Sequence, residues 1–472
     1  MTGWVWADSL PITVEHWSKD HRQQQQGFSV NKRLTPVGRR SKVTLLSRRN
    51  VLSGGAFALV AAPSHAAAPG PTSGQYLSTS GKNTAAPARA SAISHEILEV
   101  GPGKKYRTLT EAGCFMNSIP RWNNGYTDPA TIERMGFRII ISPGPPGYYT
   151  NDSGSHSRRW PSLVGWPPYE GMLLGPVIIE GEAGKPAPVL DTDGSGDGVL
   201  YYQTGLFATG SCDATFRHLI FRGFRRHDDI GNYAAVRLGQ TFAKIPMNSH
   251  VLFEDCEFSG CDTGIMGGAV GQSLTLRRCY FHDNGNDTGR VHNIYFSDGD
   301  TLTVEDTLST RCKIGHLLKT RAAKTIIRNT RLIGNGGTES ACLDVPDGGI
   351  LDIDGLVCEK SPGTDAHWVI HYSGENQDAA GVPFHIPSGI TIRDLTMVAP
   401  QTMLRRPGFN SFIGFANQSG LGAASSGKGS YMVTPKTDGV KVYGLSERSA
   451  GLPCTVLQTK PLLDLRSPVH NT

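Results

Sequence analysis

Four residues that can exchange protons or stabilise charge recur at nearly regular intervals in the middle of this sequence. Each directly follows an apolar residue, in the pairs Ile294-Tyr295, Leu318-Lys319, Leu343-Asp344 and Ile370-His371. Because successive side chains of a β-strand point to opposite faces, the apolar member of each pair would face inward and its neighbour outward. Stacked in this register, the four polar residues would form one outward column.

This column, with Arg321 and Ser297 two positions further along, holds the groups that cleave a uronic-acid polymer by β-elimination. The reaction needs a base for the weakly acidic C5 proton, a fixed positive partner for the carboxylate, and an acid for the departing O4. We expect Lys319 to be the base, with Arg321 and His316 lowering its pKa. Arg321 or a bound Ca²⁺ would stabilise the carboxylate, and Tyr295, an Arg or a His would protonate O4.

The other polar residues of this face are candidates for binding the substrate, namely His316, Asp344, His371 and Ser297. Each has a structural alternative. Lys319 and Asp344 would also suit a surface ion pair, which contributes little to stability. His292 and His316 would suit polar positions inside the coil, and Tyr295 would suit packing at the rim as well as stacking on a sugar. A purely ionic role for Lys319 predicts that Lys319→Ala leaves turnover intact, whereas a catalytic one predicts lost turnover with a nearly unchanged melting temperature.

Acidic residues elsewhere are compatible with two further kinds of site. Asp228 and Asp229 could be the paired carboxylates of a hydrolase, or a solvated turn. Four turn residues could bind Ca²⁺ or be ordinary surface residues: Asp283, Asp287, Asp298 and Asp300.

A repeat of about 25 residues positions all of these side chains. Its apolar anchors are Phe253, Leu276, Val304, Ile327 and Ile353, which are 23, 28, 23 and 26 residues apart. After each anchor come two mostly polar residues and then a small or apolar one, a pattern typical of a strand that turns a corner. A unit this short cannot bury its own apolar side but can do so when stacked on its neighbours. The pattern predicts an all-β fold, a parallel β-helix.

The cysteines fit the same repeat. Cys256 and Cys279 occupy the position after the corner, where other units have Leu219, Thr307 and Leu356. We therefore expect them to be small buried apolar residues rather than disulfide partners. The close pair Cys256 and Cys261 leaves a local disulfide as the alternative.

The start of the repeat region resembles a known superfamily. Gly101-Pro102-Gly103 precedes a capping-box pattern, Thr108 to Glu111, which predicts a helix from Leu109 to about Ile119 that covers the first coil. A strand, Ile139-Ile140-Ile141, then ends at Ser142-Pro143-Gly144. With Tyr148, these features resemble the entry to right-handed parallel β-helix proteins of the pectate-lyase-like superfamily, and the resemblance covers roughly residues 97–445. It implies the fold, but not one activity, because the superfamily contains lyases, hydrolases, esterases, epimerases and binding tailspikes.

A local resemblance is more specific about chemistry. The segment from Lys319-Thr320-Arg321 to Asn329 is similar to the Lys-Ser-containing strand of the chondroitinase-B and alginate-lyase family. In that family the Lys is the base and an Arg of a neighbouring coil is the acid, so the resemblance implies the base role for Lys319. The family's metal-binding Asn and Glu pattern is absent from this sequence, and the resemblance therefore does not imply Ca²⁺.

The N-terminal region predicts export. Arg48 and Arg49 form a twin-arginine pattern, followed by an apolar stretch and by small residues suited to cleavage after Ala66 or Ala68. We predict a twin-arginine (Tat) signal region with an N-terminal extension at 1–68, a disordered linker at 69–95, a β-helix at 96–450 and a tail at 451–472. Such a protein would pass through the bacterial Tat machinery and be periplasmic or secreted.

Charge and hydropathy exclude other classes. Nine of the 46 Lys and Arg and three of the 41 Asp and Glu lie in residues 1–68, which leaves 37 basic and 38 acidic residues in the rest. A nearly neutral body does not attract nucleic acid. No apolar run reaches the roughly 20 residues of a membrane span.

We therefore expect an exported protein that acts on an acidic polysaccharide, most simply a lyase. The alternatives are a glycoside hydrolase or C5-epimerase using the same face, or a glycan-binding β-helix without activity.

Overall fold

The computed structural model describes residues 94–118, 135–144, 176–191, 206–209, 213–225, 233–239, 248–362, 369–372, 385–399, 413–415, 436–444 and 452–469. The chain divides into two units, Met1–Thr84 and Ala85–Thr472, and every described residue belongs to the second. Arg48, Arg49, most of the predicted linker, Asp228 and Asp229 lie outside the described residues.

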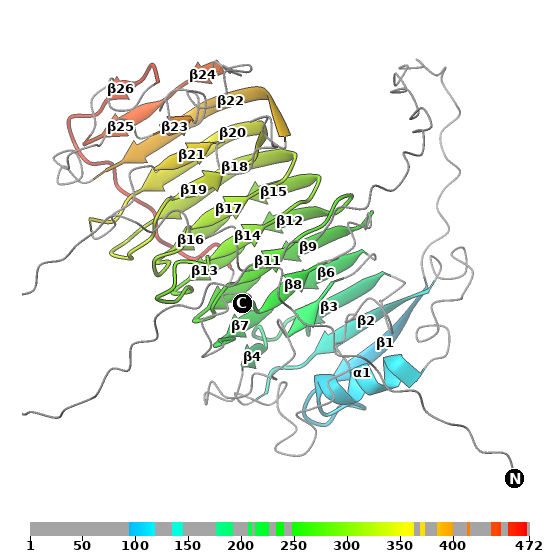
Figure 1. Cartoon of the computed structure of the whole chain (residues 1–472). Coiled ribbons are helices and arrows are strands. Elements are labelled where there is room, and N and C mark those ends of the chain that lie inside the picture. Colours follow the sequence, from blue (N-terminus) through cyan, green and yellow to red (C-terminus); the bar gives the residue numbers. More distant parts are fainter. Residues whose placement is uncertain are drawn as a thin grey trace, which may run out of the picture. The chain divides into compact units, whose positions relative to one another are not determined.

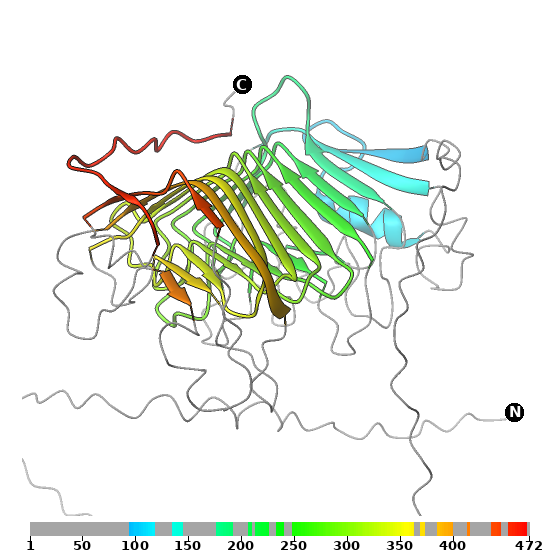
Figure 2. The same ribbon diagram turned by 90° about the horizontal axis from the view of Figure 1, so that it is seen from above.

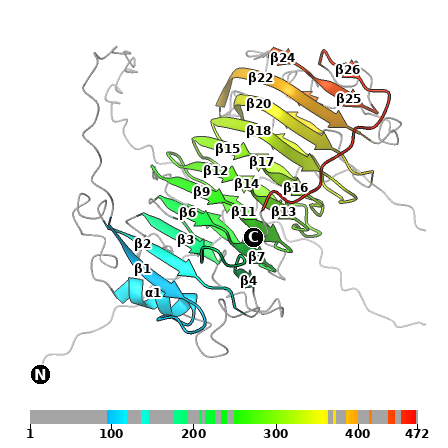
Figure 3. The same ribbon diagram turned by 180° about the vertical axis from the view of Figure 1, so that it is seen from behind.

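The described residues form two sheets of parallel strands. The smaller sheet has eight strands: β5 (Phe207–Ala208), β8 (Val236–Leu238), β11 (Ile265–Gly267), β14 (Ile294–Phe296), β17 (Leu318–Thr320), β19 (Leu343–Val345), β21 (Ile370–Tyr372) and β23 (Ile413–Phe415). Figure 1 shows its strands following one another along the stack, and Figure 3 shows the same stack from behind.

The larger sheet has 18 strands: β1 (Ser94–Val100), β2 (Met135–Ile141), β3 (Val177–Gly181), β4 (Val189–Asp191), β6 (Ala214–Arg217), β7 (Ile220–Arg222), β9 (His250–Glu254), β10 (Glu257–Ser259), β12 (Ser273–Arg277), β13 (Tyr280–His282), β15 (Thr301–Glu305), β16 (Leu308–Thr310), β18 (Lys324–Ile333), β20 (Gly348–Glu359), β22 (His385–Val398), β24 (Lys436–Asp438), β25 (Lys441–Tyr443) and β26 (Thr455–Val456). Each central coil contributes two of these strands, or one long strand, that meet at a corner. Together with the smaller sheet they build the expected right-handed parallel β-helix.

The corner is a column of residues in the left-handed backbone conformation. Its members include Asp255, Asp306 and Asn329, with φ of 54°, 48° and 43°. Asp and Asn tolerate this region better than most other residues, and Gly355 occupies the same position with φ of 75°. In each repeat two mostly polar residues follow the apolar anchor, and the second of them adopts the left-handed conformation that turns the chain at the corner.

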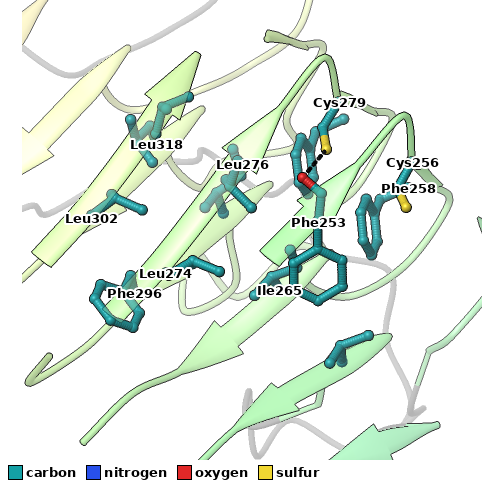
Figure 4. Close-up of a cluster of buried hydrophobic side chains, with 14 of the residues drawn as sticks. Phe253, Cys256, Phe258, Ile265, Leu274, Leu276, Cys279, Phe296, Leu302 and Leu318 are labelled. Carbon is teal, nitrogen blue, oxygen red and sulfur yellow. Dashed lines mark hydrogen bonds between the residues drawn. The ribbon is translucent and has the colours of Figure 1, made fainter. Parts of the chain in front are cut away.

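The residues after the corner form a buried rung, as predicted. Cys256, Cys279, Thr307 and Leu356 are all fully buried. Figure 4 shows the two cysteines pointing into the core, where the Cys279 sulfur lies 3.5 Å from the carbonyl oxygen of Phe253. Cys256 and Cys261 are both free thiols, so the alternative of a local disulfide is wrong.

Aromatic side chains make the stacking visible in the core. Phe216 lies parallel to Phe253 with ring centroids 4.5 Å apart, and Phe258 lies parallel to Phe281 at 4.6 Å. These distances are close to the separation of adjacent strands, so equivalent positions of successive coils are in direct contact.

The two ends of the described region carry further contacts. Helix α1 (Leu109–Ser118) starts after Thr108, whose hydroxyl accepts a hydrogen bond from the Glu111 amide at 3.2 Å, and Leu109 is buried in the core. Strand β1 starts at Ser94, two residues before the predicted start of the β-helix at residue 96. At the other end, Asp464 pairs with Arg331 at 3.0 Å, and Figure 2 shows the C-terminal segment running back along the stack. None of the described helices is long and apolar enough to cross a membrane.

Candidate active site on the outer face of the smaller sheet

The predicted column is present in the structure. Tyr295 pairs in register with Lys319, Lys319 with Asp344, and Asp344 with His371. The apolar neighbours of these residues, which include Ile294, lie in the core. The same column continues backwards through Met266 of β11 and Arg237 of β8.

Asp344 is the centre of the charged contacts. Its Oδ2 lies 2.8 Å from the Lys319 Nζ, and its Oδ1 lies 2.7 Å from the His371 Nδ1. His316 Nε2 lies 3.6 Å from the same Oδ2. Burial alone would raise the pKa of Asp344, but His316, Lys319 and His371 outweigh it and hold that pKa well below its usual range. Asp344 is therefore a permanent carboxylate at neutral pH.

Arg321 connects the phenol of the column to a second carboxylate. Its Nε donates a hydrogen bond to the Tyr295 hydroxyl at 2.9 Å, and its guanidinium forms an ion pair with Asp347. The Lys319 ammonium lies 5.9 Å from the centre of the Tyr295 ring. Two cations thus lie beside one phenol.

His292 and His316 lie on this outer face rather than inside the coil. The His292 ring meets the Tyr295 ring edge to face at 5.4 Å, and its Nδ1 accepts the backbone amide of His316 at 3.1 Å. The two histidines connect neighbouring coils, as expected for polar positions inside the coil. They do so on the outer side of the sheet instead of the inner side. Burial and the nearby charges of His316 and Lys319 lower the pKa of His292 well below its usual value.

These side chains point outward but are largely shielded from solvent. The Lys319 side chain is 9% exposed and that of Asp344 is 1% exposed. The surface ion pair considered from the sequence is therefore a buried one. His316, Arg321 and His371 are more accessible, with side chains 18%, 12% and 14% exposed. Ser297 donates its hydroxyl to the carbonyl oxygen of Gly268 at 3.1 Å.

The sequence argument missed Arg237 and Asp347. Val236-Arg237-Leu238 has the same apolar, polar, apolar pattern as the other members of the column, so the frame extended two coils backwards would have found it. The intervening Met266 interrupted the run of polar residues. Asp347 follows the end of β19, and nothing in the repeat marks it as a partner of Arg321.

Three of the four acidic turn residues, Asp283, Asp287 and Asp300, have partners other than a metal. Asp283 pairs with Arg311 at 2.7 Å, and Asp287 pairs with Lys313 at 2.9 Å. Asp300 accepts the Gly271 amide at 2.8 Å. Within the described residues no group of three or more His, Cys, Asp or Glu is arranged to hold a metal ion.

Comparisons with known proteins agree with the geometry at the level of the fold. The family model described as "Right handed beta helix region" matches residues 199–351, which include Arg237, Tyr295, Lys319 and Asp344. The chain is a right-handed parallel β-helix. No curated protein and no solved structure matches this β-helix. The comparisons therefore stop at the repeat fold, which polysaccharide-acting enzymes and glycan-binding proteins both use, and the narrower resemblances to the pectate-lyase-like and chondroitinase-B groups are not supported by them.

Proposed function

We propose that this β-helix cleaves an acidic polysaccharide by β-elimination on the outer face of the smaller sheet. One observation carries the proposal: Arg321 donates a hydrogen bond to the Tyr295 hydroxyl at 2.9 Å, with Lys319 on the same side. This hydrogen bond fixes the phenol oxygen beside two cations, and a phenol oxygen positioned in this way can serve as a general base when ionised.

The ion pair with Asp344 changes the roles expected from the sequence. A carboxylate 2.8 Å from Nζ stabilises the ammonium form of Lys319, and an ammonium cannot accept a proton. We therefore assign the base to Tyr295 and the binding of the substrate carboxylate to Lys319 and Arg321. Asp344 and His371 then position Lys319, and His316 remains a candidate for binding the sugar.

The proposed step is balanced without a metal or other co-reactant. The Tyr295 phenolate takes the C5 proton, and the C5–H electron pair becomes the C4=C5 double bond. The C4–O4 bond breaks, and the O4 of the leaving sugar takes the proton back from Tyr295. Lys319 and Arg321 stabilise the negative charge that develops on the carboxylate during the step.

The hydrolase alternative has less support in this site. A glycosidase needs one protonated carboxyl group as its general acid. The pKa of Asp344 is held well below its usual range, and Asp347 is paired with Arg321, so neither carboxyl group suits that role. A C5-epimerase uses the same first proton transfer, and its products distinguish it.

Elimination can be measured directly, and Tyr295→Phe is the decisive variant. The purified chain is incubated with alginate, pectate and glycosaminoglycans, and the ultraviolet absorbance of the new C4=C5 bond is followed. We expect Tyr295→Phe to lower the rate by about 10²- to 10⁴-fold, because it removes only the proton-accepting oxygen. Tyr443→Phe, on β25 of the larger sheet, is the matched control and should keep full activity.

Three outcomes would contradict the proposal in different ways. Cleavage without absorbance indicates a hydrolase, and altered uronate configuration without cleavage indicates an epimerase. Retention of a polysaccharide without any turnover indicates a binding protein.

The export of the chain is a separate part of the proposal. It rests on Arg48 and Arg49 and on the small residues before Ala68, all in the sequence. We expect Lys at both arginine positions to retain the precursor in the cytoplasm, because the twin-arginine pair is the recognised feature of this signal. N-terminal sequencing of exported protein checks it, and residues 1–40 in the mature chain would contradict it.

A further inference from the structure

Arg237 is a buried cation in the same column as Tyr295. It lies on β8, in register with Met266 of β11, which is in register with Tyr295. Adjacent strands are about 4.8 Å apart, so the backbones at Arg237 and Tyr295 are separated by about 10 Å along the stack. Only 3% of Arg237 is exposed.

The guanidinium of Arg237 lacks the partners that a buried charge requires. Its Nε and Nη2 have no hydrogen-bond acceptor among the residues that the structure describes. Burial lowers the pKa of Arg237 to about 10, which still leaves it charged at neutral pH. An isolated buried charge is strongly unfavourable, and native proteins normally pair such a group or supply it with a ligand.

The two carboxylates of the site are already engaged by other cations. Asp344 contacts Lys319 and His371, and Asp347 contacts Arg321. The described site therefore contains one positive charge more than it neutralises internally. That charge lies at one end of the column, beyond Met266.

Between the two ends the column is apolar. Met266 forms a small cluster with Ala234 and Val291, separate from the main core, and Tyr295 packs against it. Met266, Ala234 and Val291 are buried, so within this cluster the partly buried Tyr295 is the residue that can face the apolar C–H side of a sugar ring. An acidic polymer that crosses the strands would contact Tyr295 first and Arg237 two strands away.

We propose that Arg237 is an anion-binding subsite that takes the carboxylate of a second uronate, on a sugar other than the one that is cleaved. The planar guanidinium matches a carboxylate in two parallel hydrogen bonds. This inference rests on the proposed function for the identity of the ligand. It implies that the preferred substrate is acidic at more than one sugar, and that Arg237 determines specificity without taking part in the proton transfers.

Ligand-dependent thermal unfolding of the full chain tests the subsite without measuring activity. The probes are oligogalacturonate and oligoalginate, with neutral oligogalactose and inorganic sulfate as comparisons. We expect both acidic oligosaccharides to raise the melting temperature of the wild type, and neutral oligogalactose to have no effect. Arg237→Met should weaken this binding roughly 30-fold or more, because it removes a buried charge partner. Arg237→Lys should keep part of it.

The behaviour without ligand supplies a second signature. Arg237→Met should melt no lower than the wild type, because it replaces an unpaired buried charge with an apolar side chain of similar length. Arg393→Met, in a solvent-exposed row on β22, is the control and should keep the full ligand-dependent shift.

The remaining outcomes overturn either the subsite or the proposed function, and they can be told apart. A large loss of stability in ligand-free Arg237→Met would show that the guanidinium has a structural partner. Equal shifts in wild type and Arg237→Met would place the anion elsewhere, and a shift with sulfate alone would exclude the uronate carboxylate. Binding that depends on Arg237 but yields no elimination product would contradict the proposed lyase activity and leave the subsite intact. Elimination that does not depend on Arg237 would contradict the subsite and leave the lyase activity intact.

Discussion

The two sheets carry charge on their outer faces in opposite ways. On the larger sheet one row alternates in sign from strand to strand, through Glu180, Arg217, Glu254, Arg277, Glu305, Arg328, Asp354, Arg393 and Asp438. Its arginines are solvated, with the Arg217 and Arg277 side chains 42% and 40% exposed, whereas Glu180 and Glu254 are more buried. Cross-strand pairs of opposite charge stabilise a sheet modestly, so the role of this alternating row is to hold successive coils together.

The column on the smaller sheet does not alternate regularly in sign, and its central ion pair, Lys319 with Asp344, is shielded from solvent. Arg237, Tyr295 and Lys319 bring two cations and a phenol to one face before the first carboxylate, Asp344, appears. Identical backbone spacing therefore serves two purposes. Where every charge is matched by its neighbour, little remains to attract a ligand; where cations are buried and exceed their partners, an anionic ligand completes the site.

The largest difference between the two regions should appear in stability. Lys319→Ala leaves the Asp344 carboxylate buried, with its main cation removed, and should lower the free energy of unfolding by about 3–5 kcal/mol. This revises the sequence-based expectation that Lys319→Ala would hardly change the melting temperature, which assumed an exposed residue. Chemical denaturation measures the change.

The alternating row supplies the control. Arg277→Ala removes two partly exposed pairs, with Glu254 and Glu305, and should cost about 1 kcal/mol or less for each. The double variant Lys319→Met with Asp344→Leu should recover much of the loss, because no buried charge remains. If Lys319→Ala and Arg277→Ala lowered the free energy of unfolding equally, the ion pair of the smaller sheet would contribute no more to stability than the alternating row of the larger sheet.

A smaller difference is expected in the response to pH. Burial and nearby cations lower the pKa of His292 well below its unfolded value of about 6.5. The folded state therefore binds fewer protons than the unfolded state below about pH 6.5, and the free energy of unfolding should fall as the pH drops. For one histidine the slope is at most about 1.4 kcal/mol per pH unit. Denaturation at pH 7 and pH 5.5 checks it.

Two variants separate His292 from the other histidines. His292→Gln should reduce the loss of stability between these pH values, because it removes the titrating group. His250→Gln, on β9 of the larger sheet, should leave the loss unchanged. The interpretation is wrong if His292→Gln retains the full pH dependence.

The repeat made the register of the site predictable. Each anchor places one apolar residue in the core, so a slip of one residue would expose Ile294 and bury Tyr295 among apolar side chains. That constraint was sufficient to align Tyr295, Lys319, Asp344 and His371 without a structure. It also placed Cys256 and Cys279 on the rung, because the corner residue before them must adopt a left-handed conformation.

Burial and partner choice were not predictable in the same way. The repeat specifies which side of the strand a residue occupies, but not how much solvent reaches that side. Lys319 was therefore taken as exposed although its side chain is 9% exposed. The contact of Arg321 with Asp347 depends on the chain after β19, and His292 left the expected interior side because its segment precedes the strand.

The single strand β11 between Arg237 and Tyr295 has a consequence for how substrate range could change over evolution. In a solenoid the distance between two such positions is a whole number of coils, so it changes only by gain or loss of a complete repeat. Gradual adjustment of a loop cannot lengthen it. Relatives that act on polymers with wider charge spacing would then differ from this chain by an integer number of coils between the two residues, with the core rungs otherwise unchanged.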